Sequence, residues 1–171
     1  ILRDYKWIVF TSAAGVEAFY QAMTNRKKDI RSLAGLKFAV IGTGTKKAVE
    51  KRGIFTDLMP DVYSGAALGQ ALAKIAEPGD RILIPRSAIG TEDVIRPLRE
   101  AGLLLDDIPV YDTLEAEDGP LWDESIDYAA FTSASTVRGF VKRNPDLDYS
   151  KVRAVCIGEQ TAAAAREKGM R

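Results

Sequence analysis

The chain contains the segment Asp127-Tyr-Ala-Ala-Phe-Thr-Ser-Ala-Ser-Thr-Val-Arg-Gly-Phe140 and an earlier copy of it, Tyr5-Lys-Trp-Ile-Val-Phe-Thr-Ser-Ala-Ala-Gly-Val-Glu-Ala-Phe19. Each copy begins with an apolar run typical of a strand, continues through Phe-Thr-Ser-Ala, and ends with the apolar spacing of a helix. A Ser/Thr-capped helix that directly follows a buried strand leaves free backbone N–H groups at the carboxyl end of that strand. Open parallel α/β sheets bind ligands at this edge. The two copies therefore predict one ligand held from two sides.

Strand and helix patterns alternate along the rest of the chain. Apolar runs predict strands at 7–10, 37–41, 56–59, 81–84, 103–111, 128–131 and 152–157, and the fifth of these is expected to be interrupted at Asp106-Asp107. Helical spacing follows most of them, with Ser, Thr or Gly at the helix starts. This alternation predicts an α/β fold made of two similar lobes, each a parallel sheet flanked by helices, in a duplicated flavodoxin-like arrangement.

The internal repeat also divides the chain. We expect a first α/β domain at residues 1–112, a polar and acidic connection at 113–119, and part of a second α/β domain at 120–171. The second copy contains only two predicted strands, which cannot cover their own faces and edges. Segments before residue 1 and after residue 171 are therefore expected to complete the second domain.

Composition disfavours several classes of protein. Lys+Arg and Asp+Glu number 24 each, so no net charge favours nucleic acid or an anionic membrane. The chain has no histidine, which removes Ser-His-Asp catalysis and the usual zinc sites. The single cysteine, Cys156, lies in an apolar run, where we expect a buried and unreactive thiol. One cysteine builds no disulfide framework, and the sequence shows no signal-peptide pattern, so we expect a cytoplasmic protein.

One glycine-rich segment resembles a nucleotide-binding loop. Gly42-Thr-Gly-Thr-Lys-Lys47 follows a predicted strand and opens a helix. However, Lys47 occupies the third glycine position, and no acidic residue ends the next strand at the required spacing. A nucleotide or phosphate-handling site is therefore disfavoured.

Hydroxyl side chains follow the predicted strands instead. Any one of them can be a simple helix N-cap, but together they would line one rim of each sheet. Such a rim of helix N-termini favours anions such as carboxylates. The candidate binding residues with hydroxyl groups are Thr11, Ser12, Thr45, Ser64, Ser133 and Thr161. Arg86, at a strand end, either adds a bidentate contact to a carboxylate or forms a surface ion pair.

Tyr111 ends the first domain where the connection begins. Without histidine, general acid work falls to tyrosine, lysine, a carboxyl group or water. Two interpretations of Tyr111 stay open from the residues: a proton donor that points into a cleft between the domains, or a tyrosine packed at a domain edge with its hydroxyl in water. Glu115, Glu117 and Asp118 are a possible carboxylate group, but their position in the connection favours solvated side chains.

Together these motifs resemble the uroporphyrinogen-III synthase family. The matching segments are Trp7–Phe19, Val40-Ile-Gly-Thr-Gly-Thr45, Ile84-Pro-Arg86, Val110-Tyr-Asp-Thr113, Phe131-Thr-Ser-Ala-Ser-Thr-Val-Arg138, Cys156-Ile-Gly158 and Thr161-Ala162. The resemblance covers essentially the whole chain. The set in this order is specific, although no single motif is.

The resemblance implies a lyase without cofactor or metal that acts on hydroxymethylbilane, a linear tetrapyrrole with eight carboxylates. Such an enzyme removes the terminal hydroxyl as water and closes the macrocycle with inversion of ring D. Tyr111 matches the family's tyrosine and would assist the departure of the hydroxyl. Ser12, Thr45, Ser133 and Thr161 would contact substrate carboxylates. We expect a monomer, and a fused uroporphyrinogen-III methyltransferase domain stays an open alternative for the natural polypeptide.

Two segments depart from the family pattern. Ile89-Gly-Thr-Glu92 lacks the basic residue that many members carry after the Pro-Arg strand end, and Glu159-Gln160 replaces the more usual Pro-Thr pair. A rival interpretation is a two-lobed small-anion-binding or sensor domain without catalysis, which would use the same strand-end caps. A signal sequence or oxidised cysteines would favour that rival, and the sequence shows no pattern of either.

Overall fold

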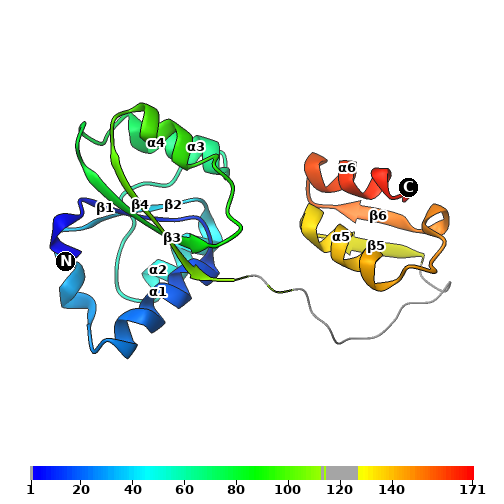
Figure 1. The fold of residues 1–171 in the computed structure, drawn as a ribbon, viewed down its shortest axis with the longest axis horizontal. Coiled ribbons are helices and arrows are strands. Elements are labelled where there is room, and N and C mark those ends of the chain that lie inside the picture. The colour runs from blue at the N-terminus through cyan, green and yellow to red at the C-terminus, as the bar shows by residue number, and fades with distance from the viewer. Residues whose placement is uncertain (1, 113, 115–126) are drawn as a thin grey trace. The chain divides into compact units, whose positions relative to one another are not determined.

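The computed structural model describes residues 2–112, 114 and 127–171, which fall into two compact units, Ile1–Thr113 and Leu114–Arg171 (Figure 1). Apart from Leu114, the predicted connection at 113–119 lies outside the described residues, and so do Glu115, Glu117 and Asp118.

The first domain contains a four-stranded sheet in the order β2-β1-β3-β4, with all neighbouring strands parallel. The strands are β1 (Trp7–Phe10), β2 (Lys37–Val40), β3 (Arg81–Ser87) and β4 (Leu104–Tyr111). In place of the strand expected at 56–59, Leu58 forms a single parallel bridge to Ala39 on β2. The carboxyl ends of all four strands therefore point to one edge of the sheet.

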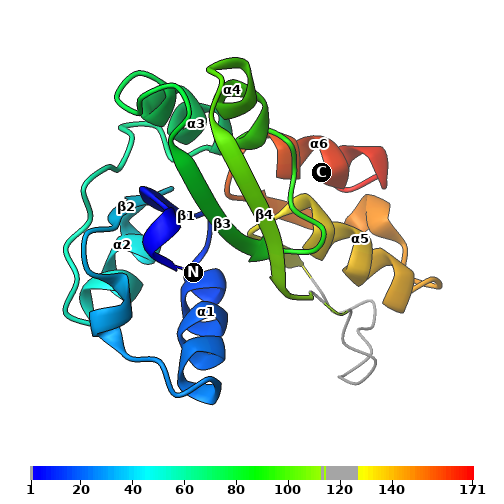
Figure 2. The same cartoon turned by 60° about the vertical axis from the view of Figure 1, so that its left-hand side comes forward.

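Helices cover both faces of this sheet, with α1 (Ala13–Asn25) and α2 (Thr43–Glu50) on one side and α3 (Gly65–Ala73) and α4 (Ile95–Glu100) on the other (Figures 1 and 2). Short 3-10 helices precede β1 (Leu2–Asp4) and β2 (Ile30–Leu33). On β1, Ile8 and Phe10 pack with α1 and α2, whereas Trp7 and Val9 pack with α3 and α4. Burial on both faces explains why β1 is continuously apolar.

Asp106 and Asp107 do not interrupt β4, so that prediction was wrong. The strand is continuous from Leu104 to Tyr111. Arg81 Nε on β3 donates to Asp106 Oδ2 at 2.7 Å, and Arg86 on the same strand pairs with Asp107. Each carboxylate is thus paired with an arginine of the neighbouring strand, which offsets the low strand propensity of aspartate.

The second domain contains the parallel pair β5 (Tyr128–Phe131) and β6 (Arg153–Cys156), with helices α5 (Ala134–Arg143) and α6 (Glu159–Glu167) and a 3-10 helix at Tyr149–Lys151. Ala129, Phe131, Ala154 and Cys156 face the core shared with the helices. The alternate positions are open, since Tyr128 is 60% exposed and Val155 57% exposed. The prediction of a buried Cys156 was therefore wrong, because its strand is covered on one face only and Cys156 is half-buried.

Both domains follow the same order of elements. The units β1–α1–β2–α2 and β5–α5–β6–α6 each pair two parallel strands. Ser12 and Ser133 cap the first helix of each unit, and Gly42 and Gly158 stand at the cap of the second. The structure thus confirms the α/β fold with parallel sheets flanked by helices.

Replacement of Tyr20 by phenylalanine should raise the free energy of unfolding by about 1 kcal/mol, because the Tyr20 hydroxyl is buried and has no hydrogen-bond partner among the described residues. Burial also raises the Tyr20 pKa above 10.0. Because an unfolded tyrosine ionises near pH 10, Tyr20 makes the wild type lose stability above that pH, and the variant should lose less. Urea unfolding at pH 7 and at pH 10.5 measures both effects, and a less stable variant at pH 7 would contradict the assignment.

Candidate functional site

Ser12 and Tyr111, predicted separately from the sequence, are in direct contact. Ser12 stands in extended backbone between β1 and α1, and its Oγ accepts a hydrogen bond from the Gly15 N–H at 2.9 Å. The same oxygen lies 2.9 Å from the Tyr111 hydroxyl at the end of β4. The start of the first repeat's helix and the end of the last strand of the domain therefore meet at one point of the sheet edge.

The close approach of α1 to β3 depends on a glycine that the sequence reasoning missed. A Cβ atom added to Gly15 would lie 3.0 Å from the Pro85 carbonyl oxygen and 3.2 Å from Ser12 Oγ. Such contacts are tighter than Cβ atoms normally make, so a larger residue would force its neighbours to move by a few tenths of an ångström. One sequence signal could have found this residue. A glycine in the first turn of a helix lowers stability, so its presence there indicates a close contact with another element.

The backbone of Tyr111 is placed by an irregularity between β3 and β4. Their register shifts between Arg86 and Ser87, so that Arg86 pairs with Pro109 but Ser87 pairs with Tyr111. The Ala88 N–H then donates to the Tyr111 carbonyl oxygen at 3.1 Å. A bulge of this kind re-aims the side chains beyond it, and here the side chain beyond it is the predicted proton donor.

The other predicted hydroxyl residues of the first domain lie at helix starts of the same sheet edge. Ser64 caps α3, and its Oγ accepts from the Ala67 N–H at 3.2 Å. Thr45 lies in the first turn of α2 and is buried, and Thr11 is half-buried directly after β1. Their contact with a ligand stays a prediction.

Tyr63 is a further residue at this edge that the sequence reasoning missed. Its ring packs on Gly42 at the cap of α2, where an added Cβ atom would lie 3.0 Å from Tyr63 Cγ. Nevertheless, the side chain is 57% exposed. The rim therefore offers an aromatic surface beside the N-terminus of α2, and the only sequence signal was an aromatic residue directly before the Ser64 cap.

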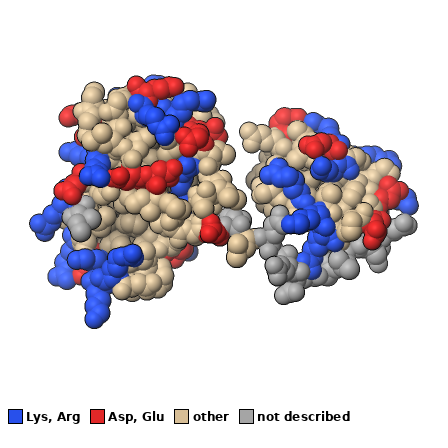
Figure 3. All heavy atoms as spheres, viewed as in Figure 1, with Lys and Arg blue, Asp and Glu red and all other residues tan. Residues whose placement is uncertain are grey.

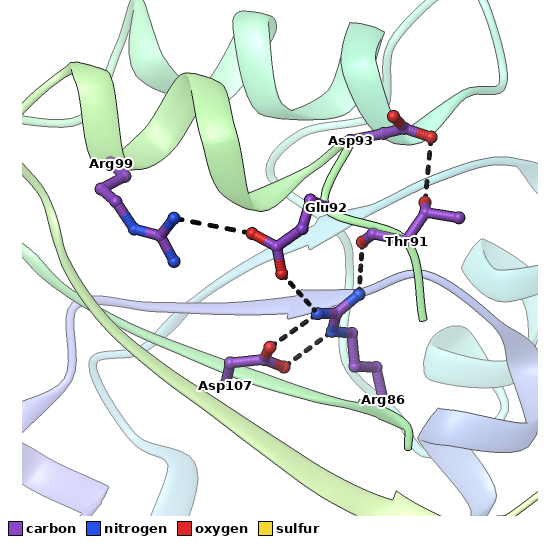
Figure 4. A network of polar contacts seen from close by, with 6 residues as sticks. All are labelled: Arg86, Thr91, Glu92, Asp93, Arg99 and Asp107. Carbon is purple, nitrogen blue, oxygen red and sulfur yellow. Dashed lines mark hydrogen bonds and ion pairs between the residues drawn. The ribbon is translucent and has the colours of Figure 1, made fainter. Parts of the chain in front are cut away.

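Arg86 does not present its guanidinium to solvent. The side chain is only 8% exposed, and Nε and Nη2 donate to the two carboxylate oxygens of Asp107 at 2.7 and 2.6 Å. Nη1 donates to the Thr91 carbonyl, and Glu92 lies 3.7 Å away (Figure 4). All three guanidinium nitrogens thus have partners within the first domain. Neither alternative from the sequence, a contact to a ligand carboxylate or an exposed ion pair, describes this geometry.

In the second domain, Ser133 and Thr161 line one hollow of about 360 Å³ at the ends of β5 and β6. Its lining residues are Thr132, Ser133, Ala134, Ile157, Gly158, Glu159, Gln160 and Thr161. Ser133 forms a capping box with Thr136 at the start of α5, and Thr161 is buried in the first turn of α6. Two helix N-termini therefore border this hollow, which suits an anion of carboxylate size.

Glu159 places a negative charge in the same hollow. Arg166 Nη1 donates to its Oε1 at 2.9 Å, and Nη2 lies 3.4 Å from Oε2. These hydrogen bonds hold the Glu159 pKa below its usual value, so the carboxylate is ionised at neutral pH. This charge opposes the binding of a second anion, except to the extent that Arg166 neutralises it.

On the face shown in Figure 3, acidic and basic side chains are interspersed on each domain. Within the ranges that the structure describes, no three metal-ligating side chains gather in one place. In the same ranges, no helix has the length and apolar character needed to cross a membrane.

Both domains are α/β units with parallel sheets, and each places helix N-termini and hydroxyl groups at the carboxyl edge of its sheet, where proteins of this class bind ligands. The model of the uroporphyrinogen-III synthase HemD family matches residues 1–171, and the chain belongs to that family.

The chain is similar to named relatives at 25–31% identity over the aligned residues. It is 31% identical over 176 residues to the porphyrin biosynthesis protein HemD of Ruminiclostridium josui, a match that covers 99% of the chain and 35% of that protein. It is 29% identical over 182 residues to a putative uroporphyrinogen-III synthase of Methanocaldococcus jannaschii, with coverage of 99% and 73%. The chain therefore spans about a third of the first relative and nearly three quarters of the second.

Solved structures share the fold. A mutant uroporphyrinogen III synthase from Thermus thermophilus superposes with a TM-score of 0.69 at 19% identity, covering 99% of the chain and 71% of that protein. The uroporphyrinogen-III synthetase of Helicobacter pylori gives a TM-score of 0.69 at 18% identity, with coverage of 98% and 75%. At these identities the likeness speaks for the fold alone.

Proposed function

We propose that the protein containing this chain is a uroporphyrinogen-III synthase, a hydro-lyase that cyclises hydroxymethylbilane with loss of water and inversion of ring D. Family membership supports the class of reaction. The observation that carries the site assignment is the 2.9 Å contact between Ser12 Oγ and the Tyr111 hydroxyl at the sheet edge. It joins a possible proton donor to a helix N-terminus that favours anions.

Either hydroxyl can donate in the contact between Ser12 and Tyr111, and in the proposed step Ser12 is the donor. Ser12 Oγ already accepts from the Gly15 N–H, and its own hydrogen can be donated to the Tyr111 oxygen. The Tyr111 hydrogen is then free to point at the departing hydroxyl of the substrate. Proton donation by a positioned side chain contributes about 10²–10⁴-fold in rate. The electron-rich pyrrole supplies the electrons that expel the hydroxyl, so no cofactor is required in the proposed step.

The remaining task of the protein is to hold the substrate in one conformation, because unassisted closure gives the symmetrical type I isomer. Substrate carboxylates would bind at the helix starts of both domains, at Thr11, Ser12, Thr45, Ser64, Ser133 and Thr161. Well-oriented reacting groups lower a barrier by about 7–11 kcal/mol at the extreme. Backbone N–H groups at several helix starts provide this orientation without a large positive charge, in keeping with a chain of net charge zero.

Analysis of the product tests the proposed reaction. The full-length protein is supplied with hydroxymethylbilane, the product is oxidised, and type I and type III porphyrins are separated. The proposal expects type III. Type I alone would end it and would leave the non-catalytic small-anion-binding domain as the better interpretation.

Replacement of Glu159 by glutamine should lower the KM for hydroxymethylbilane about two- to fivefold at low ionic strength, because the hollow at the ends of β5 and β6 loses its negative charge and Arg166 is released. The effect should shrink as salt is added. Steady-state kinetics at two salt concentrations measure it. Glu167→Gln, at the far end of α6, is the matched control and should leave KM unchanged. An unchanged or raised KM in Glu159→Gln would contradict carboxylate binding in this hollow.

Cytoplasmic location and a monomeric state complete the proposal, and both stay predictions. A fused methyltransferase domain also stays open. The match to the Ruminiclostridium josui protein leaves most of that relative outside the shared region.

A further inference from the structure

We propose that Arg86 is a positioning residue: its buried guanidinium locks the loop after β3 against β4 and thereby fixes the place of the Tyr111 hydroxyl. The proposal rests on the proposed function, in which Tyr111 donates the proton. It assigns Arg86 an action through Tyr111 instead of a contact with the substrate.

The guanidinium joins two segments that are separate in the sequence. Its Nε and Nη2 form a two-point contact with Asp107 on β4, and its Nη1 holds the carbonyl oxygen of Thr91 in the loop between β3 and α4 (Figure 4). Glu92 lies 3.7 Å from Nη2 and 3.6 Å from Arg99 Nη1, which extends the contact to α4. Only arginine offers donors in this fixed planar arrangement.

The loop is shaped around the guanidinium. An added Cβ atom at Gly90 would lie 2.3 Å from Arg86 Nη1 and 2.9 Å from Cζ. No side chain fits at this position while the guanidinium occupies its place. Thr91 Oγ1 donates to Asp93 Oδ2 at 2.9 Å, which holds the far side of the loop. The buried position of the Arg86 guanidinium thus requires glycine at position 90.

The same loop also makes a hydrogen bond to the backbone of Tyr111 on β4. The register shift begins directly after Arg86, and the Ala88 N–H, two residues along the loop, bonds to the Tyr111 carbonyl. Asp107 fixes β4 before the shift, and Thr91 fixes the loop after it. Arg86 therefore holds the chain on both sides of the register shift. That shift sets the position from which Tyr111 contacts Ser12.

The first test is Arg86→Lys in the full-length protein. Lysine keeps the charge but cannot make the two-point contact and hold Thr91 at once. We expect kcat to fall about 10- to 100-fold with KM within about twofold, since a displacement of about 1 Å at a reacting group costs on the order of 10²-fold. Gly90→Ala should act in the same direction. The matched control is Arg81→Lys, which alters the other cross-strand pair of β3 and β4 at the end remote from Tyr111 and should leave kcat unchanged.

A double-mutant cycle with Tyr111→Phe separates positioning from general destabilisation. If Arg86 acts through the Tyr111 hydroxyl, Arg86→Lys should have little further effect on the kcat of folded Tyr111→Phe protein. Fully multiplicative losses, or an unchanged kcat in Arg86→Lys, would overturn the proposal.

A readout that needs no activity keeps this test distinct from the test of the proposed function. With tyrosines labelled at Cζ, the NMR signal of Tyr111 should shift in Arg86→Lys and stay in place in Arg81→Lys. Absence of synthase activity in the wild type would defeat the proposed function alone, whereas an unmoved Tyr111 signal in Arg86→Lys would defeat the positioning role.

Discussion

Replacement of Tyr111 by phenylalanine should lower the turnover of hydroxymethylbilane by about 10²–10⁴-fold and leave its KM nearly unchanged. The variant keeps the ring that packs beside Gly15 but loses the hydroxyl that contacts Ser12. A group that acts only as the leaving hydroxyl departs affects the transition state and not the bound substrate. Steady-state kinetics of the full-length variant measure the effect.

Tyr20→Phe is the matched control for this prediction. It removes a tyrosine hydroxyl from the same domain at a site on α1, away from the cap, and should leave turnover unchanged. Unchanged turnover in Tyr111→Phe would remove the role of proton donor. A raised KM with unchanged kcat would make Tyr111 a binding residue instead.

Replacement of Phe10 by alanine should lower the free energy of unfolding by about 3–5 kcal/mol. Phe10 is fully buried at the end of β1, and its ring meets the edge of Phe19 with centroids 5.6 Å apart. The cavity would lie between the sheet and α1. Both elements are held in place by close packing, so they cannot move together to fill it. Urea unfolding followed by circular dichroism measures the loss.

Phe55→Ala is the matched control because the same atoms are removed from a side chain that is 84% exposed, and it should change stability by less than about 0.5 kcal/mol. A comparable loss in both variants would show that the loss at Phe10 does not come from its burial in the core.

Local sequence patterns predicted the parts of the site that depend on local structure. Ser12, Ser64 and Ser133 all cap the helices expected to follow them, because an N-cap needs only its own residue and the N–H group three positions on. The alternation of strands and helices was likewise predictable, since each helix carries its own apolar face.

The contacts between distant segments could not be predicted in this way. The pairing of Ser12 with Tyr111 depends on the strand order β2-β1-β3-β4 and on the register shift after Arg86. Asp107 was expected to interrupt a strand because aspartate has a low strand propensity. Its partner, Arg86, lies on the neighbouring strand, and no local pattern reveals that pairing. The open face of β5 and β6 depends on which elements cover that sheet, and strand composition alone does not show this.

Ser12 uses one oxygen atom for two contacts, one to the first turn of α1 and one to Tyr111. Helix ends open locally at much lower cost than whole domains unfold. Fraying of that turn would release Tyr111 while the sheet stays intact. In the proposed enzyme, heat inactivation should therefore begin several degrees below the melting temperature and should reverse on cooling.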